Sequence, residues 1–255
     1  MTDLKDDKRF ANTLARGLNV LRVFGPADSG LTNLELSERT GIPRSTISRL
    51  TFTLCALGYL THGRHHDLYR LGPASLALGN IASATFAFVD AARPIMQTLA
   101  DQTGTLIGVA VHDEGKMLMV KTWRPVGSPT NWLDVGFRMP IQNSSTGAGF
   151  LGALTDKEFT KLITRQPQLD TEEISELLMI SRQQVLALGF AYVEAKDRFT
   201  KSINAVAAPY RPTEFGEPVT FLSGANSEDL AESTIKSSVG PALAKAVKAL
   251  QRVAP

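Results

Sequence analysis

The sequence contains little cysteine and no long apolar run. Its 255 residues include one cysteine, Cys55, which excludes an internal disulfide and zinc sites with four cysteines or two cysteines and two histidines. No run of 18 apolar residues occurs, so we expect no membrane-spanning helix. The segment Met1–Phe10 carries both charge signs and no apolar stretch, so we expect no signal peptide and a cytoplasmic protein. Because 43% of the residues are hydrophobic and 20% are charged, most of the chain should fold.

The charge is unevenly distributed along the chain. The net charge is only +2. Residues 1–72 contain ten Lys and Arg against seven Asp and Glu, whereas residues 73–255 contain seventeen against eighteen. The basic excess therefore lies in the N-terminal part, which is where a nucleic-acid contact should be sought.

Three helices are expected in this N-terminal part. The first ends before Gly25 and has an apolar face formed by Leu14, Leu18, Leu21 and Phe24. Thr32 can cap the second helix, which Gly41 ends after about two turns. The third should run from Pro43 to Leu57, with an apolar stripe of Ile47, Leu50, Leu54 and Leu57. Two strands at 59–61 and 68–71 should then flank a polar turn.

This order predicts a winged helix-turn-helix whose third helix enters a DNA major groove. The outer side of that helix has arginines and hydroxyl side chains but no acid: Arg44, Ser45, Thr46, Ser48 and Arg49. Arginine reaches guanine edges or phosphates, and hydroxyls hydrogen-bond to either. Arg64 in the wing is a candidate phosphate or minor-groove contact. Thr32 is a candidate phosphate contact at a helix N-terminus, although capping alone explains it.

The rest of the chain has a different pattern. A helix at 73–84 should connect it, and a second helix is expected at 90–102. Further helices are expected at 146–154, 156–164 and 171–188, and strands at 105–111, 116–123, 191–195, 203–209 and 219–223. Strands joined as hairpins and flanked by grouped helices indicate an α+β domain with an antiparallel sheet.

Several motifs resemble those of the IclR family of bacterial transcription regulators, over about Thr13 to Ala225. Residues 41–50 (GIPRSTISRL), 57–60 (LGYL) and 69–72 (YRLG) are similar to the winged helix-turn-helix of that family. Residues 187–191 (ALGFA), 206–209 (VAAP) and 222–224 (LSG) resemble signatures of its C-terminal ligand-binding domain, which has a GAF-like fold.

The resemblance implies a winged helix-turn-helix domain at 9–72, a linker helix at 73–87 and a GAF-like effector-binding domain at 88–255. It further implies a homodimer, often a dimer of dimers, that binds a pseudo-palindromic double-stranded DNA operator. An organic or aromatic acid is the effector class that it implies. Arg16 matches an arginine that the family uses near phosphate.

The resemblance also places the effector pocket near residues 143–146. Three hydroxyl side chains there exceed the single one that capping needs, and free N–H groups at a helix start attract anions. Trp132 in the preceding loop can pack on an aromatic ligand or plug the core. The full set of pocket candidates is Trp132, Asn143, Ser144, Ser145, Thr146, Glu194, Asn204, Phe221 and Ser223.

The sequence departs from the family pattern at three places. The family usually has H-x-T-x-x-G-K around the small-residue helix, and here Gln142 and Ala148 replace its histidine and lysine. Ala205 replaces a common cysteine, and the acidic run after the glycine–aromatic signature reads VEAKD at 193–197. The pocket chemistry of the family therefore does not carry over directly.

Other site chemistries are less well supported. His62, His65, His66 and Asp67 resemble a metal site, but a short exposed hairpin has no outer contacts to fix the rings. Residues 147–152 spell G-x-G-x-x-G without the βαβ context of a dinucleotide site, and close helix packing accounts for the glycines. No G-x-S-x-G motif occurs and His112, expected to be exposed, is the only histidine outside the wing, which argues against a hydrolase.

The sequence thus predicts an effector-controlled DNA-binding regulator without catalytic residues, cofactor or metal. Two alternatives stay open at this point. One is an enzyme or ligand carrier with an incidental N-terminal helical domain, and the other is a scaffold that binds partner proteins.

Overall fold

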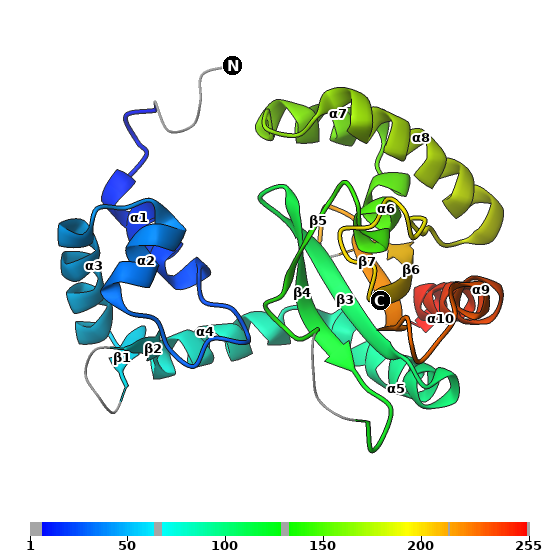
Figure 1. The fold of residues 1–255 in the computed structure, drawn as a ribbon, viewed down its shortest axis with the longest axis horizontal. Coiled ribbons are helices and arrows are strands. Elements are labelled where there is room, and N and C mark those ends of the chain that lie inside the picture. Colours follow the sequence, from blue (N-terminus) through cyan, green and yellow to red (C-terminus); the bar gives the residue numbers. More distant parts are fainter. Residues whose placement is uncertain (1–6, 64–67, 129–132, 214, 254–255) are drawn as a thin grey trace. The chain divides into compact units, whose positions relative to one another are not determined.

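The computed structural model describes residues 7–63, 68–128, 133–213 and 215–253 (Figure 1). Contacts divide the chain into two compact units, Met1–Thr85 and Phe86–Pro255. Among the described residues, no single helix is long and apolar enough to cross a membrane. Only α4 (Pro73–Ala84) and α5 (Ala87–Thr103) pass that test when they are counted together.

Unit 1 is a winged helix-turn-helix. It begins with α1 (Asn12–Arg22), α2 (Asn33–Thr40) and α3 (Arg44–Ala56), and continues with the antiparallel strands β1 (Leu60–His62) and β2 (Tyr69–Leu71) and with α4. Gly41 ends α2 at φ 69°, a left-handed conformation that glycine adopts without steric cost. The order of elements and the turn at Gly41 agree with the sequence prediction, whereas the predicted wing turn lies largely outside the described residues.

Helix α1 packs against the core of unit 1 through only part of the predicted apolar face, since Leu21 and Phe24 are partly buried against it. Its buried residues are Gly17 and Val20, whereas Leu14 and Leu18 are 63% and 51% exposed. Gly17 faces α3, where an added Cβ would lie 3.9 Å from the Leu50 side chain, an ordinary van der Waals distance. The predicted apolar face was therefore wrong for Leu14 and Leu18. Leu57, predicted in the apolar stripe of α3, is the C-cap residue of that helix and is exposed.

Unit 2 contains a five-stranded antiparallel sheet of order β5-β4-β3-β7-β6. The strands are β3 (Leu106–Asp113), β4 (Lys116–Trp123), β5 (Arg138–Pro140), β6 (Ile203–Tyr210) and β7 (Val219–Asn226). The helices are α5, α6 (Ser145–Gly152), α7 (Asp156–Arg165), α8 (Thr171–Leu188), α9 (Glu232–Thr234) and α10 (Gly240–Val253), with a π-helical turn at Ile235–Val239. This is the predicted α+β architecture.

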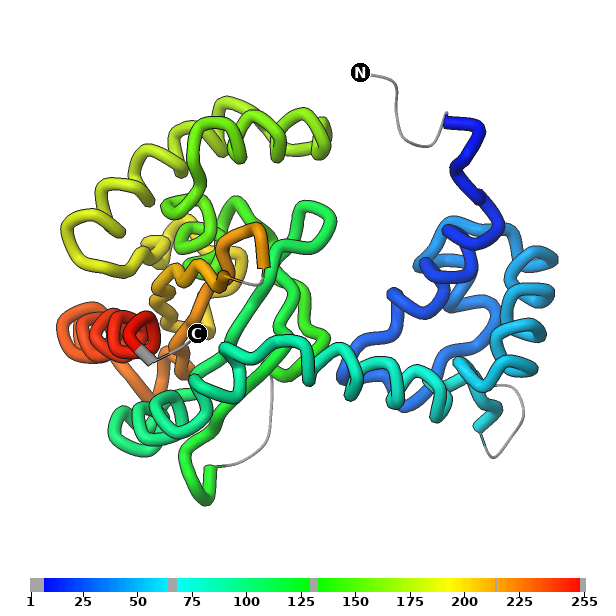
Figure 2. The backbone as a smooth tube through the Cα atoms, turned by 180° about the vertical axis from the view of Figure 1, so that it is seen from behind, coloured from blue at the N-terminus to red at the C-terminus, as the bar shows by residue number. Residues whose placement is uncertain are grey.

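Two hydrophobic cores lie on opposite faces of this sheet. Helices α5 and α10 pack on one face, around Phe88, Phe221 and Leu243, and Figures 1 and 2 show these two helices side by side. Helices α6, α7 and α8 belong to the other face, around Phe150, Ile174 and Leu222. Because neighbouring strand residues point to opposite faces, Phe221 and Leu222 on β7 belong to different cores.

Two predictions for the C-terminal part need correction. The strand expected at 191–195 is absent from the described structure, where Ala191 forms a single bridge to Ala207. The C-terminal helices were not predicted, although Val239, Leu243, Val247 and Leu250 repeat at helical spacing and are all buried.

Candidate functional site

The outward face of α3 carries the charged and hydroxyl residues predicted for DNA. Ile47, Leu50 and Leu54 of this helix are buried against unit 1. Arg44, Ser45, Ser48 and Arg49 are exposed on the other side, and Thr46 is half-buried. The sequence of α3 contains no acidic residue. The helix therefore presents a positively charged face with hydrogen-bonding side chains.

Phe52 lies on the same outward side and was not singled out from the sequence. Its side chain is 76% exposed. It follows Ser48 by four residues and Arg49 by three, so the three side chains share one helix face. A check of the outward positions of α3 for apolar residues would have found it.

The N-terminus of α2 is fixed by a reciprocal capping box. The Thr32 side chain accepts from the Glu35 N–H at 3.2 Å, and the Glu35 carboxylate accepts from the Thr32 N–H at 2.7 Å and from its hydroxyl at 2.8 Å. These hydrogen bonds lower the pKa of Glu35. The Thr32 hydroxyl is therefore engaged within the chain. Arg16 is exposed on α1, and Arg64 lies outside the described residues.

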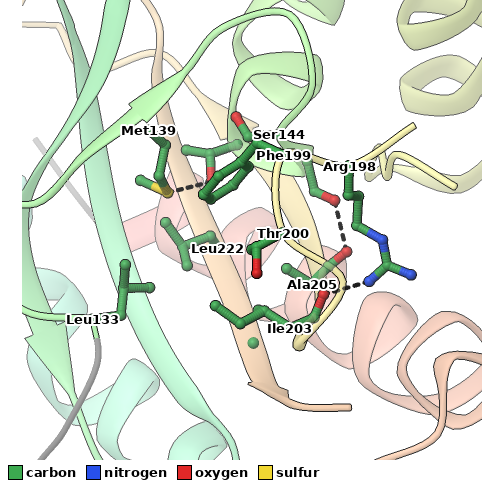
Figure 3. Close-up of a pocket in the computed structure, with 12 residues that line it drawn as sticks. Leu133, Met139, Ser144, Arg198, Phe199, Thr200, Ile203, Ala205 and Leu222 are labelled. Atoms are coloured by element: carbon green, nitrogen blue, oxygen red, sulfur yellow. Dashed lines mark hydrogen bonds between the residues drawn. The ribbon is translucent and has the colours of Figure 1, made fainter. Parts of the chain in front are cut away.

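A small cavity in unit 2 lies at the start of α6 (Figure 3). Its volume is about 30 Å³. Its lining is mainly apolar and comes from β5 and the loop before it, the start of α6, the 198–200 loop, the edge strand β6 and its neighbour β7: Leu133, Met139, Ser144, Ser145, Thr146, Arg198, Phe199, Thr200, Ile203, Ala205, Leu222 and Gly224. The structure thus brings together three of the predicted pocket residues, Ser144, Ser145 and Thr146.

The three hydroxyls of this segment all have contacts inside the chain. Ser144 caps α6 by accepting from the Gly147 N–H at 3.0 Å, and it donates to the Pro140 carbonyl at 2.5 Å. The Ser145 hydroxyl donates to the Ala205 carbonyl at 2.8 Å and accepts from the Val193 N–H at 3.2 Å. The Thr146 hydroxyl lies 3.4 Å from the Met139 sulfur. These contacts hold the cavity wall together.

The other predicted pocket residues lie elsewhere. Phe221 and Ser223 point to the opposite sheet face, where the Ser223 hydroxyl lies 2.7 Å from that of Thr105, and their neighbours Leu222 and Gly224 line the cavity instead. Asn143 is half-buried, and its carbonyl accepts from the Phe199 N–H at 3.0 Å. Trp132 lies outside the described residues. Asn204 and Glu194 belong to a polar network beside the cavity.

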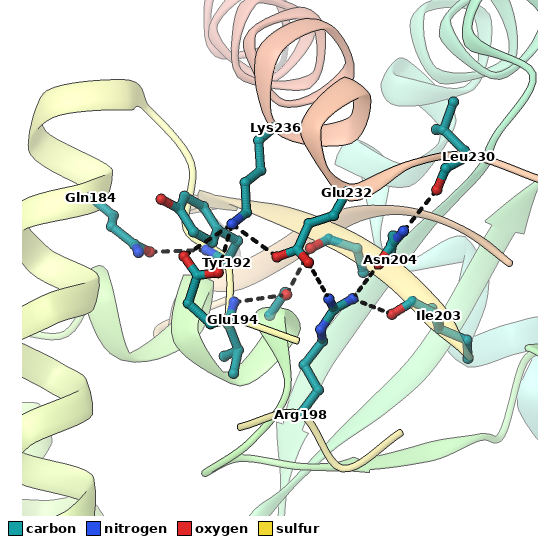
Figure 4. Close-up of polar contacts among 12 residues, drawn as sticks. Gln184, Tyr192, Glu194, Arg198, Ile203, Asn204, Leu230, Glu232 and Lys236 are labelled. Atoms are coloured by element: carbon teal, nitrogen blue, oxygen red, sulfur yellow. Dashed lines mark hydrogen bonds and ion pairs between the residues drawn. The ribbon is translucent and has the colours of Figure 1, made fainter. Parts of the chain in front are cut away.

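That network centres on Arg198, which sequence reasoning missed (Figure 4). The Arg198 side chain is 5% exposed. Its guanidinium donates to the Ile203 carbonyl, to the Asn204 Oδ1 at 2.7 Å and to the Glu232 Oε2 at 2.9 Å. Among the described residues, its Nε has no hydrogen-bond partner. Arg198 therefore places a buried cation at the wall of the cavity.

Glu232 connects Arg198 to a second cation, Lys236. The Lys236 ammonium lies 2.9 Å from Glu232 and 2.9 Å from Glu194, and 4.1 Å from the centre of the Tyr192 ring. Burial opposes ionisation of Glu232, but Lys236 and Arg198 outweigh it and lower its pKa. These hydrogen bonds and ion pairs connect the segment before β6 with α9 and the π-helical turn that follows it.

A larger cavity of about 300 Å³ lies on another side of unit 2, between the β3–β4 hairpin, α7 and the β6–β7 turn. His112 lines it, stacks on Phe150 at 5.0 Å between ring centres and has its Nδ1 3.6 Å from Glu217. Burial lowers the pKa of His112, against the opposing effect of Glu217. His112 is half-buried, so the expectation that it is exposed was wrong.

The glycines of the G-x-G-x-x-G segment sit where helix α6 meets its neighbours closely. A Cβ on Gly147 would lie 2.0 Å from the Ile141 carbonyl oxygen, one on Gly149 2.8 Å from Thr220, and one on Gly152 2.7 Å from Val185. Packing therefore accounts for all three glycines. Among the described residues, no cluster of three metal-ligating side chains occurs, but His65, His66 and Asp67 lie outside them.

Two family models match the chain. The IclR helix-turn-helix domain matches residues 13–63, and the bacterial transcriptional regulator IclR C-terminal domain matches residues 83–246. The HTH-type transcriptional regulator TsaQ1/TsaQ2 of Comamonas testosteroni is 26% identical over 94% of this chain and 87% of its own length.

Solved structures share the fold of this chain. An IclR family transcriptional regulator from Brucella abortus has a TM-score of 0.77 and 27% identity, covering 100% of this chain and 97% of that one. An IclR homologue from Microbacterium hydrocarbonoxydans, complexed with 4-hydroxybenzoate, has a TM-score of 0.64 and 20% identity, covering 93% and 99%. The chain therefore belongs to the IclR family and is a DNA-binding transcriptional regulator, as its relatives are named.

Proposed function

We propose that the chain reads its operator with the outward face of α3. The observation that carries this proposal is the acid-free surface of Arg44, Ser45, Ser48 and Arg49 on the third helix of a winged helix-turn-helix. Thr46 flanks this face, and Arg16, Thr32 and Arg64 are proposed phosphate contacts. The Thr32 contact would use its helix N-terminus, since its hydroxyl is engaged in the capping box.

The test is a salt-controlled binding titration on operators selected from random duplex DNA. Arg44→Ala and Arg49→Ala should each weaken binding by about 1–3 kcal/mol if they reach bases. Arg165→Ala removes the same charge from an exposed position on α7 and should leave affinity unchanged. Equal affinity of the α3 variants and the wild type would place the interface elsewhere.

We infer that the functional form is a homodimer, or a dimer of dimers, joined in part through unit 1. Helix α4 has no buried residue, and Leu76, Leu78 and Ile81 on it are exposed. The exposed Leu14 and Leu18 of α1 are a second apolar surface. Apolar surfaces of this kind mark interaction sites, and a symmetric dimer matches an operator with half-sites about 34 Å apart or a multiple of that.

Light scattering tests the dimer. The pair Leu76→Glu and Ile81→Glu should shift the protein toward monomer, because charges would be buried at the interface. Asn80→Glu adds the same kind of charge at an exposed polar position of the same helix, and this control should keep the mass of the wild type. An unchanged mass in the double variant would exclude α4 from the interface.

We propose that a small organic or aromatic acid binds the cavity at the start of α6 and changes DNA affinity. The buried guanidinium of Arg198 in the cavity wall carries this proposal, because its Nε has no hydrogen-bond partner among the described residues and a carboxylate pairs well with arginine. The relative crystallised with 4-hydroxybenzoate supports the same effector class. The cavity of about 30 Å³ is far below the roughly 300 Å³ of ordinary ligand sites, so binding requires the 198–200 loop, with the exposed Phe199, to move outward.

A thermal-shift screen of aromatic and aliphatic acids tests the effector. A ligand at 100 times its Kd stabilises the fold by about 2.7 kcal/mol. Ala205→Leu should abolish the shift by filling the cavity, and Lys201→Ala, exposed and outside the lining, should preserve it. A full shift in Ala205→Leu would place the ligand elsewhere. An effector acts on DNA binding only if it favours one quaternary arrangement, typically by about 1–3 kcal/mol. We propose that this regulation takes place in the cytoplasm.

A further inference from the structure

Phe52 occupies the fourth place of a regular stripe on α3. Ser45, Ser48, Arg49 and Phe52 are spaced i, i+3, i+4 and i+7, so they lie on one face of the helix. This is the spacing with which the recognition helix of a homeodomain reads the major groove. Ile47, Leu50 and Leu54 lie on the opposite, buried face. The stripe therefore lies on the side of α3 that is directed away from the core of unit 1.

The Phe52 ring takes no part in the core packing of unit 1. The ring is 76% exposed, and Phe52 belongs neither to the core of unit 1 nor to the partly buried side chains packed against it. An aromatic side chain is among the largest sources of buried apolar area in an interface. Its exposure on a helix of otherwise polar outward residues indicates a partner that offers an apolar group.

Duplex DNA fits this surface better than a second copy of the chain. The neighbours of Phe52 on the stripe are an arginine and two serines, and α3 contains no acid, which suits phosphates and base edges. The apolar group that the major groove displays is the C5-methyl of thymine, and phenylalanine is one of the side chains that contact it.

We propose that Phe52 packs on a thymine methyl group and makes the operator prefer thymine at that position in each half-site. The proposal rests on the proposed insertion of α3 into the major groove. Seven residues along an α-helix span about 10 Å, so the thymine should lie roughly three base steps of 3.4 Å from the base nearest Ser45.

The experiment replaces single thymines by uracil, which removes only the methyl group. Operators are selected from random DNA with the full chain, and each thymine of the selected site is then replaced in turn. Fluorescence anisotropy measures the affinity of the wild type, Phe52→Ala and Phe52→Leu at fixed salt. Circular dichroism checks that the variants keep their fold, which is expected because the ring lies outside the core.

We expect uracil at one position of each half-site to weaken wild-type binding about fourfold per methyl. Phe52→Ala should bind the thymine operator more weakly and show no difference between thymine and uracil there. Phe52→Leu should retain part of the difference. Uracil at the other positions should affect the wild type and Phe52→Ala equally.

Two results overturn the proposal. One is the same uracil penalty in the wild type and Phe52→Ala at every position. The other is a loss of the dimer in Phe52→Ala, seen by light scattering, with the thymine preference unchanged, which would assign the ring to a second copy. Arg49→Ala is the separate test of the α3 interface. If this variant binds the operator as tightly as the wild type, the interface itself is misplaced. If it binds more weakly while the uracil penalty is the same in the wild type and Phe52→Ala, only the role of Phe52 is refuted.

Discussion

Gly147→Ala should strongly destabilise unit 2 because no space exists for one methyl group. The added Cβ would lie 2.0 Å from the Ile141 carbonyl oxygen and 2.7 Å from the Ile141 carbonyl carbon and Cα, all of them backbone atoms. Real Cβ contacts essentially never fall below 3.0 Å, so the start of α6 and the segment before it must separate by about 1 Å (3.0 minus 2.0). We therefore expect the loss of unfolding free energy to reach or exceed about 3 kcal/mol, the upper end of the usual cost of overpacking.

Thermal unfolding followed by circular dichroism measures the effect. A loss of about 3 kcal/mol corresponds to a drop in Tm of roughly 6–12 °C for a unit of this size. Gly216→Ala is the control, because a Cβ at Gly216 meets nothing within 4 Å, and it should change the free energy of unfolding by no more than about 0.5 kcal/mol. If Gly147→Ala is as stable as the wild type, the start of α6 does not pack as closely against the Ile141 backbone as the structure indicates.

Two further substitutions test local contacts. Thr32→Ala should destabilise unit 1 by about 1 kcal/mol, because it removes the side-chain cap of α2, and Thr32→Ser should restore most of that loss in urea unfolding; equal stability of all three proteins would contradict the capping role. The hydrogen bonds from Arg211, outweighing burial, lower the pKa of Glu158 from 4.5 to about 2, so the stabilisation by this pair is complete above pH 4.5 and is lost as the pH falls toward 2. The wild type should therefore lose its advantage over Glu158→Gln, about 1 kcal/mol after solvent screening, between pH 5 and pH 2.5, and a pH-independent difference would be the contrary result.

Elements with strong local signals were predicted well. Helix α8 runs from Thr171 to Leu188 as expected, because Asp170 caps its start and the left-handed Gly189 ends it. The β3–β4 hairpin turns at Glu114 and Gly115, both with positive φ, as an Asp-Glu-Gly turn between two alternating strands indicates. Helix α3 was predicted from Gly41, Pro43 and its apolar stripe, which are also local signals.

Features that depend on packing between elements were not predictable in this way. On α1, Gly17 and Val20 are buried whereas Leu14 and Leu18 are exposed, a choice that depends on packing against the rest of unit 1 and not on the apolar spacing. The pairing of β7 with β3 and β6 decides which of its residues point toward the cavity. Leu222 and Gly224 line the cavity, and Phe221 and Ser223 do not. Arg198 is buried by Asn204 and Glu232, residues 6 and 34 positions away, and no local pattern marks it.

The salt dependence of operator binding by the wild type and by the Arg44→Ala, Arg49→Ala double variant tests the central claim most directly. The slope of log K against log salt should be steeply negative for the wild type. A dimer of the double variant lacks four arginines at the proposed interface, so its slope should be shallower by up to about 3.6, at 0.9 per phosphate contact, with weaker binding at every salt concentration. Identical slopes and affinities for the two proteins would contradict the reading of DNA by α3.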